Sequence, residues 1–255
     1  MDLFRKILYP IESIFYGTIA LFAALTLGGV ASFWDELQAS TILFASLTGA
    51  VAIYLLPLDQ RLFKVRFSHL VDILIAVDLF FAVYLGEALT FYYLFPNIDK
   101  VYHFFATAQL SLAGYLLAKH FLKKNKSERS TVLALVFAFF FAVALESMWE
   151  IYEFCYDMIA GTNMQKYIAE EFYQAILDKT IQLDDATIAE FFRTFDGYHF
   201  ALMDTMLDIV TDVAGGGFGV LFCALLFRYR PELSDHILYK PGSEADALVE
   251  EKRNS

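Results

Sequence analysis

The sequence predicts an all-α, polytopic membrane protein, a bundle of about six transmembrane helices with both termini in the cytoplasm. Two observations favour this fold class. Hydrophobic residues make up 58% of the 255 residues, and the mean hydropathy of +0.50 lies well above that of an ordinary soluble domain. Several apolar runs also reach the roughly 20 residues that an α-helix needs to cross a bilayer. We therefore expect a multi-pass protein of the plasma or inner membrane.

Six candidate spans can be placed in order along the chain. They are Ile11 to Phe33, Ala39 to Leu56, Phe67 to Tyr93, Val101 to Lys119, Thr131 to Ala160 and His199 to Phe227, each an apolar run of helical length. The first is too long for the apolar part of a cleaved signal peptide, and no small-residue cleavage site follows it cleanly. We expect this span to be retained in the membrane.

Basic residues gather at alternate ends of these spans. Arg5 and Lys6 precede the first span, Arg61, Lys64 and Arg66 separate the second from the third, the segment from Lys119 to Arg129 joins the fourth to the fifth, and Arg228 and Arg230 follow the sixth. Cytoplasmic loops of membrane proteins carry the excess of Lys and Arg, so these segments and both termini are predicted to lie inside.

The chain divides into one transmembrane helical domain, residues 1–230, and a polar cytoplasmic tail, residues 231–255. Residues 162–198 form the large outer loop. Apolar residues recur at helical spacing in two parts of this loop, first at Ile168, Phe172 and Ile176 and then from Ile188 to Phe195. We expect two short amphipathic helices over the outer face, which either shield the helix ends or act as a lid over a site beneath them.

Composition and motifs exclude several functions. The formal net charge of −11 argues against nucleic acid as a partner. The sequence contains no phosphate-binding loop, no GxSxG, no HExxH and no CxxC. Cys155 lies near the outer end of the fifth span and Cys223 near the inner end of the sixth. They are therefore too far apart for a disulfide and are predicted to be unpaired. These absences leave open whether the protein is an enzyme.

Acidic residues and one histidine stand out within three of the spans. At about 1.5 Å per residue along a helix, His103, Glu146 and Asp212 fall at one level of the membrane, in its outer third. About one helical turn closer to the outer surface, the same count places Asp99, Glu150 and Asp208 together. Glu153 and Asp204 lie closer still to the outer surface. Three helices therefore carry matched levels of side chains that can act as metal ligands.

These side chains also share helix faces. The acids from Glu146 to Asp157 fall within about 60° of one another around their helix. An ionised side chain at the centre of a membrane helix costs about 2.5 to 3.5 kcal/mol to insert, so the acids are expected to face each other, water or a cation. Gly215 and Gly219 have the GxxxG spacing that lets a second helix approach closely, which would draw the polar faces together.

Three hypotheses explain how such a cluster is tolerated. Its carboxylates bind a divalent cation, share protons as a relay, or form a structural network neutralised by Lys100 and the histidines. Oxygen ligands with one imidazole suit Mg²⁺, Mn²⁺ or Zn²⁺. The candidate metal ligands are Asp99, His103, Glu146, Glu150, Glu153, Asp204, Asp208 and Asp212. Glu87, at about the level of Asp99, is a candidate further member.

The segments "DKVYHF", Asp99 to Phe104, and "DIVTDVAGGGFG", Asp208 to Gly219, resemble the VanZ-like integral membrane proteins. "WEIYEF", Trp149 to Phe154, followed by "DTMLD", Asp204 to Asp208, is similar to the YjdF-type bacterial inner-membrane proteins. The resemblance to the VanZ-like group implies a role in the cell envelope and its lipids. The chain departs from that pattern by having Asp212 in place of Asn and by its additional acids.

Two functional classes follow. In the first, a bound cation and a carboxylate base act on a lipid-linked or envelope substrate that enters from the outer leaflet, with Glu150 or His103 moving protons. In the second, the site belongs to a cation- or proton-coupled carrier with an inward path past Asp72 and Asp78. The fifth and sixth spans are almost wholly apolar or glycine below Glu146 and Asp212, which slightly favours a site open to one side.

Overall fold

The computed structural model describes residues 3–31, 33–34, 36–55, 66–67, 69–89, 91–95, 97–122, 128–160, 162, 164–165, 195–231, 233 and 238–239. Its helices are α1 (Leu3–Leu27), α2 (Glu36–Leu55), α4 (His69–Leu79), the π-helix η1 (Phe80–Ala88), α5 (Phe91–Leu94), α6 (Ile98–Phe121), α7 (Glu128–Ala160) and α10 (Phe195–Tyr229). The fold is all-helical, as predicted, apart from a two-residue antiparallel pairing of β1 (Arg66–Phe67) with β2 (Leu238–Tyr239).

Within the described part of the chain, three helices are long and apolar enough to cross a membrane. They contain the segments Ile7–Leu27, Ser130–Ala160 and Ala201–Tyr229. The continuous helix formed by α4 and η1 has 20 residues and α6 has 24, but they carry acids, two lysines and histidines within their sequences. These ionisable residues lower their hydropathy, and they include residues of the site described below.

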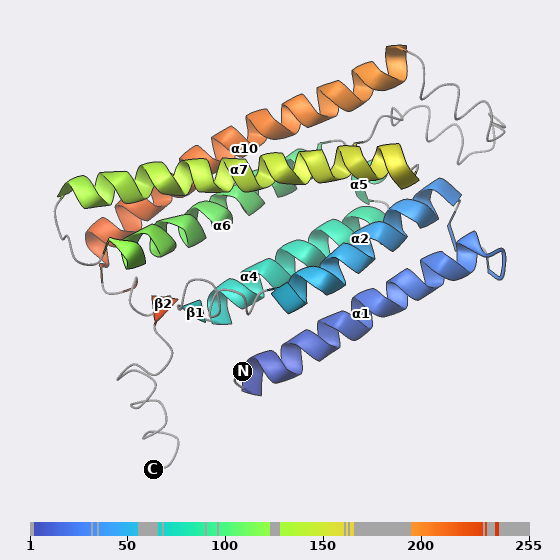
Figure 1. Ribbon diagram of the computed structural model, residues 1–255, viewed down its shortest axis with the longest axis horizontal. Helices are drawn as coiled ribbons and strands as arrows, with labels where there is room; N and C mark the ends of the chain where they lie inside the picture. The colour runs from blue at the N-terminus through green and yellow to red at the C-terminus, as the bar shows by residue number, and fades with distance from the viewer. Residues whose placement is uncertain are drawn as a thin grey trace.

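The long helices form two groups (Figure 1). In one group α6, α7 and α10 pack together around a hydrophobic cluster that includes Tyr115, Ala138 and Cys223. In the other, α1, α2 and the unit made of α4 and η1 pack around a second cluster that includes Tyr16, Ile42 and Val83. The two groups meet along α2, η1, α6 and α7, and this junction holds the cavity described below.

Two glycines of α10 bring this helix into backbone contact with α6. A Cβ atom at Gly215 would lie 2.3 Å from the carbonyl oxygen of Phe104, and one at Gly219 would lie 2.6 Å from that of Ala108. No larger residue fits either position without moving a backbone. The close helix contact predicted from the GxxxG spacing is therefore confirmed, and it lies directly beside His103.

Two predicted spans differ from the helices in the structure. The first was expected to reach Phe33, but α1 ends at Leu27, because Gly29 adopts a φ of 67°. The amide of Val30 donates to the carbonyl of Leu25, as at a helix end closed by a left-handed glycine. The third was expected to continue to Tyr93, but η1 ends at Ala88 and the chain resumes a helix only in α5.

The break after η1 has a packing cause. The amide of Leu89 donates to the carbonyl of Tyr84, a five-residue bond typical of a π-helix. Gly86 lies against the ring of Tyr92 so closely that a Cβ would come within 2.4 Å of it. The α5 helix is thereby folded back against the end of η1.

Several predictions lie outside the described residues. They include the two amphipathic helices of the 162–198 loop, most of the 231–255 tail and the side chain of Asp72.

Helix α10 begins at Phe195, four residues before the predicted start of the sixth span at His199. The pairing of β1 with β2 joins the connection after α2 to the tail at one end of the bundle (Figure 1).

Candidate metal centre

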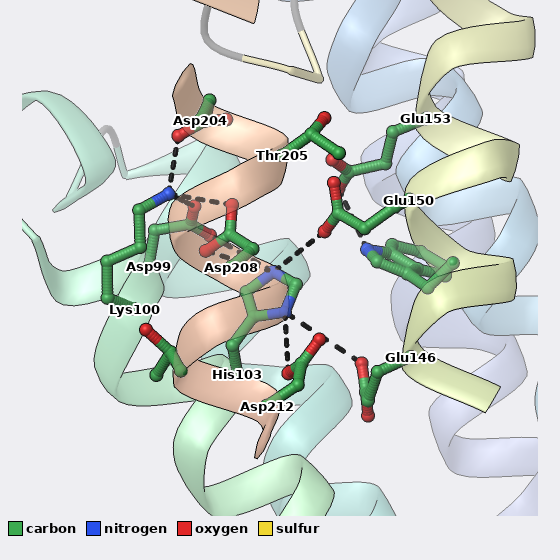
Figure 2. A network of polar contacts seen from close by, with 12 residues as sticks. Asp99, Lys100, His103, Glu146, Glu150, Glu153, Asp204, Thr205, Asp208 and Asp212 are labelled. Carbon is green, nitrogen blue, oxygen red and sulfur yellow. Dashed lines mark hydrogen bonds and ion pairs between the residues drawn. The ribbon is translucent and has the colours of Figure 1, made fainter. Parts of the chain in front are cut away.

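His103, in the second turn of α6, lies at the centre of the polar cluster (Figure 2). Its Nδ1 atom is 3.2 Å from Asp212 Oδ1 and 3.9 Å from Glu146 Oε2. Thr107, one turn further along α6, donates a hydrogen bond of 2.7 Å to the same Asp212 oxygen. The first level of residues expected from the helix spacing is thus assembled around one nitrogen of the imidazole.

The other ring nitrogen faces the second level. His103 Nε2 lies 3.7 Å from Glu150 Oε1, 3.7 Å from Asp208 Oδ1 and 4.0 Å from Asp99 Oδ1. Helices α6, α7 and α10 each supply side chains to both levels, as Figure 2 shows. The single imidazole therefore bridges two sets of carboxylates.

Lys100 contributes a positive charge at the edge of the cluster. Its Nζ atom lies 2.5 Å from Asp204 Oδ1, 2.7 Å from Asp208 Oδ2 and 3.2 Å from Asp99 Oδ2. The sequence placed Lys100 among the groups that could neutralise the acids, and the structure brings it into contact with three of them. Asp208 is shared between the lysine and the histidine.

Among the residues that the structure describes, two groups of side chains have a geometry that could hold a metal ion. One is Asp99, His103 and Asp208, and the other is His103, Glu146 and Asp212. In each group one ligand atom per residue lies within 4.8 Å of the others. Carboxylate oxygens and an imidazole nitrogen are ligands that Mg²⁺, Mn²⁺ and Zn²⁺ accept.

Carboxyl groups outnumber basic groups in the cluster. Seven carboxylates surround Lys100 and His103, those of Asp99, Glu146, Glu150, Glu153, Asp204, Asp208 and Asp212. Within the described residues, several of their buried oxygens accept no hydrogen bond: both of Glu150, Asp208 Oδ1 and Asp212 Oδ2. Buried carboxylate oxygens are costly when nothing satisfies them, so these atoms suit an added cation.

Three of the acids highlighted by the sequence have other partners. Glu153 accepts a hydrogen bond of 2.8 Å from Trp149 Nε1, and Asp204 contacts Lys100. Neither of them belongs to the two metal-compatible groups, and Glu150 lies outside both groups as well. Asp157 accepts from the backbone amides of Met164 and Gln165 at 2.8 and 2.9 Å. Asp157 therefore stabilises the turn that follows α7 and lies outside both metal-compatible groups.

A cavity of about 900 Å³ opens beside the cluster. Its walls come from α2, α4, η1, α5, α6 and α7 and are mostly apolar and aromatic, while His103, Glu146 and Glu153 lie along one side. Glu87 also lines the cavity and is buried. Its membership of the carboxylate cluster, suggested by the sequence, stays a prediction.

Sequence reasoning missed two polar contacts of this region. Thr107 follows His103 by one helical turn, and this spacing could have identified it. Gln109 donates a hydrogen bond of 2.9 Å to Asp78 across α6 and α4, and both residues line the cavity. No spacing within one helix could have predicted that second pair.

The fold and the site together define an integral membrane helix bundle that holds a buried carboxylate and histidine cluster among three helices. The chain belongs to the family described as a predicted membrane protein (DUF2238), which it matches over residues 16–229. This range includes every residue of the cluster. No curated protein and no protein of solved structure matches the chain. The resemblance to VanZ-like and YjdF-type proteins stays a prediction.

Proposed function

We propose that this membrane protein binds a divalent cation at the His103 cluster and uses it on a lipid-linked or other envelope substrate that occupies the adjacent cavity. The observation that carries the proposal is the juxtaposition of two features. A buried cluster has more carboxylates than positive charges, and it borders an apolar cavity of about 900 Å³, within the usual range for small-molecule sites.

His103, Glu146 and Asp212 form the favoured cation site. All three are buried, and they lie away from Lys100, whose ammonium group already neutralises part of the Asp99 and Asp208 side. A cation at this position would supply Lewis acidity and orient a substrate oxygen. Asp99, Asp208 and Glu150 lie on the opposite side of the imidazole, where they complete its surroundings.

Glu150 is the best placed residue to accept a proton. Its carboxylate is buried beside His103 Nε2, and neither of its oxygens accepts a hydrogen bond from the described residues. A general base needs an acceptor oxygen near the reacting group. His103 itself would hold the cation through one nitrogen and keep the other for the carboxylates or for proton movement.

A carrier is the second candidate function, and the packing argues against it. Toward the end of the bundle that carries β1 and β2, the helices close on the cluster that contains Val71, Tyr115, Leu116 and Phe227. Asp78 and Gln109 continue the polar lining of the cavity in this direction. Beyond them lies the apolar cluster. An alternating-access path would require these buried apolar side chains to separate.

The membrane arrangement proposed from the sequence places the site near the outer leaflet. We infer that α2, the unit made of α4 and η1, and α6 also cross the membrane, which gives six spans with both termini inside. Neighbouring long helices run in alternating directions (Figure 1), and α2, with 20 residues, would extend about 30 Å. The VanZ-like resemblance supports an envelope role in the plasma or inner membrane.

Metal-dependent stability tests the proposal. Chelator-treated protein in detergent is melted with and without Mg²⁺, Mn²⁺ or Zn²⁺. One of these ions at about 100 times its dissociation constant should stabilise the parent by about 2.7 kcal/mol. His103→Ala, Glu146→Gln and Asp212→Asn should each lose most of this gain, because each removes one ligand of the favoured site.

Glu153→Gln is the matched control. It removes the same charge as Glu146→Gln from the same helix, but Glu153 lies outside both metal-compatible groups and is bonded to Trp149. This variant should keep the metal response. A structural network predicts melting that is independent of metal in the parent and in all four variants, and that result would reject the cation site.

A further inference from the structure

The cavity beside the cluster has several acidic side chains in its mostly apolar lining. Five carboxylates face it, those of Asp78, Glu87, Asp99, Glu146 and Glu153, together with His103. Among the described residues that line it there is no lysine or arginine. Lys100 pairs with Asp99 of this wall as well as with Asp204 and Asp208, so Asp99 is the wall carboxylate that this lysine offsets.

One of these acids is available to a ligand. Glu146 is buried and lines the cavity, and its only polar contact among the described residues is His103 Nδ1 at 3.9 Å. It accepts no hydrogen bond from them. A buried carboxylate without a hydrogen-bond donor is unfavourable unless a positive group approaches it.

Aromatic rings surround the same space. Tyr92 of α5, Tyr102 of α6 and Trp149 of α7 all line the cavity, and Tyr92 and Tyr102 contact each other with ring centroids 5.7 Å apart. Faces of tyrosine and tryptophan attract ammonium groups, and quaternary ammonium ligands are commonly held in such surroundings. Apolar side chains form most of the remaining lining and suit a hydrocarbon chain.

We propose that the ligand of this cavity is an amphiphile with an amine or quaternary ammonium group and one apolar chain. The positive group lies against Glu87 and the aromatic rings, with Glu146 as a further partner when no cation occupies the His103 site, and the chain lies between η1 and α6. The inference deepens the proposed function, on which it rests for the view that the cavity receives the substrate. A divalent cation at His103 would leave the cavity wall with an excess of carboxylates, so the charge preference holds with or without metal.

Binding in the cavity can be measured through the fluorescence of Trp149. The chain has two tryptophans, so Trp34→Phe leaves Trp149 as the one fluorescent reporter in the cavity wall. The protein, in a neutral maltoside detergent, is titrated with dodecyltrimethylammonium, dodecanol and dodecanoate, each carrying a terminal bromine that quenches tryptophan. The titrations are run on chelator-treated and on metal-loaded protein.

The ammonium probe should bind at least about tenfold more tightly than the other two in both states, which corresponds to about 1.4 kcal/mol. Glu87→Gln in the same background should lose most of this preference, because it removes one carboxylate from the wall. Glu12→Gln is the matched control, since Glu12 lies on α1 outside the cavity lining. It should keep the preference.

The outcomes separate the two proposals. Equal quenching by the three probes would overturn the inference, and so would an ammonium preference that Glu87→Gln leaves unchanged. Tighter binding of dodecanoate in metal-loaded protein would overturn the inference while it supports the proposed function. An ammonium preference in a protein whose melting ignores metal would support the inference and reject the cation site.

Discussion

Lys100 is the residue on which the charge balance at the edge of the cluster depends. Its ammonium group contacts three aspartates, and one of them, Asp208, is fully buried. Breaking a buried ion pair by removing one partner leaves an uncompensated charge, which typically destabilises a protein by about 3 to 5 kcal/mol. Lys100 is therefore expected to stabilise the folded protein by pairing with these buried acids.

Lys100→Met should lower the free energy of unfolding by about 3 to 5 kcal/mol, because Asp204 and Asp208 lose their shared counter-charge. Thermal or denaturant unfolding of the purified protein measures the effect. Asp204→Asn should restore part of the stability when it is combined with Lys100→Met, as coupled residues depart from additivity. An unchanged melting temperature in Lys100→Met would show that the ammonium group contributes little.

At the scale of single elements, the contact between α6 and α10 positions the site. Gly215 lies against the backbone of Phe104, the residue after His103, and Gly219 lies against Ala108 one turn further on. Any side chain at these two glycines would push α10 away from α6. The distance from His103 to Asp212 depends on the same contact, because Asp212 precedes Gly215 by less than one turn.

Gly219→Ala should destabilise the protein by about 1 to 3 kcal/mol, the usual cost of overpacking, and should weaken metal binding. Gly217→Ala is the matched control, since a Cβ there meets nothing within 4 Å. That variant should be as stable as the parent or up to about 1 kcal/mol more stable, because alanine favours helix over glycine. Equal stability of the two variants would mean that the helix contact does not hold the site.

The sequence predicted the elements of the site better than their ends. Helical rise alone placed His103, Glu146 and Asp212 at one level, because long, straight helices keep a regular spacing between residues. It could not predict where α1 and η1 end, since those ends depend on the left-handed Gly29 and on the contact of Gly86 with Tyr92. Trp149 and Glu153 lie one turn apart on α7, so their spacing allowed this bond, but the sequence alone could not choose it over partners for Glu153 on the other helices.

For the whole molecule, two groups of helices build the site in different ways. The group of α6, α7 and α10 supplies the carboxylates and His103, and α2, α4 and η1 supply most of the opposite cavity wall. The α2 helix also reaches α7 directly, where Thr48 hydrogen-bonds Tyr152 and Phe44 packs on Tyr156. The first half of the chain, which carries few of the candidate ligands, is therefore needed to enclose the ligand.

The orientation of the helix bundle in the membrane determines which leaflet lies next to the cavity. The carboxylate cluster lies at the first two turns of α6 and around the third to fifth turns of α10, and β1 and β2 lie toward the opposite end of α6 (Figure 1). The segments that flank the strands carry the Lys and Arg residues expected in the cytoplasm. The topology proposed above would therefore put the cluster toward the outside.

Labelling of introduced cysteines tests this orientation. Cys155→Ser and Cys223→Ala first remove the two native thiols, of which Cys155 is exposed and Cys223 is buried. In that background, Asn125→Cys and Ser243→Cys should react with a membrane-impermeant maleimide only from the cytoplasmic side, and Asp185→Cys only from the outside. Lysed cells, in which all three should react, control for accessibility. Reaction of Asn125→Cys and Asp185→Cys from one side would reverse or break the alternation of spans, and the site could then no longer be assigned to the outer leaflet.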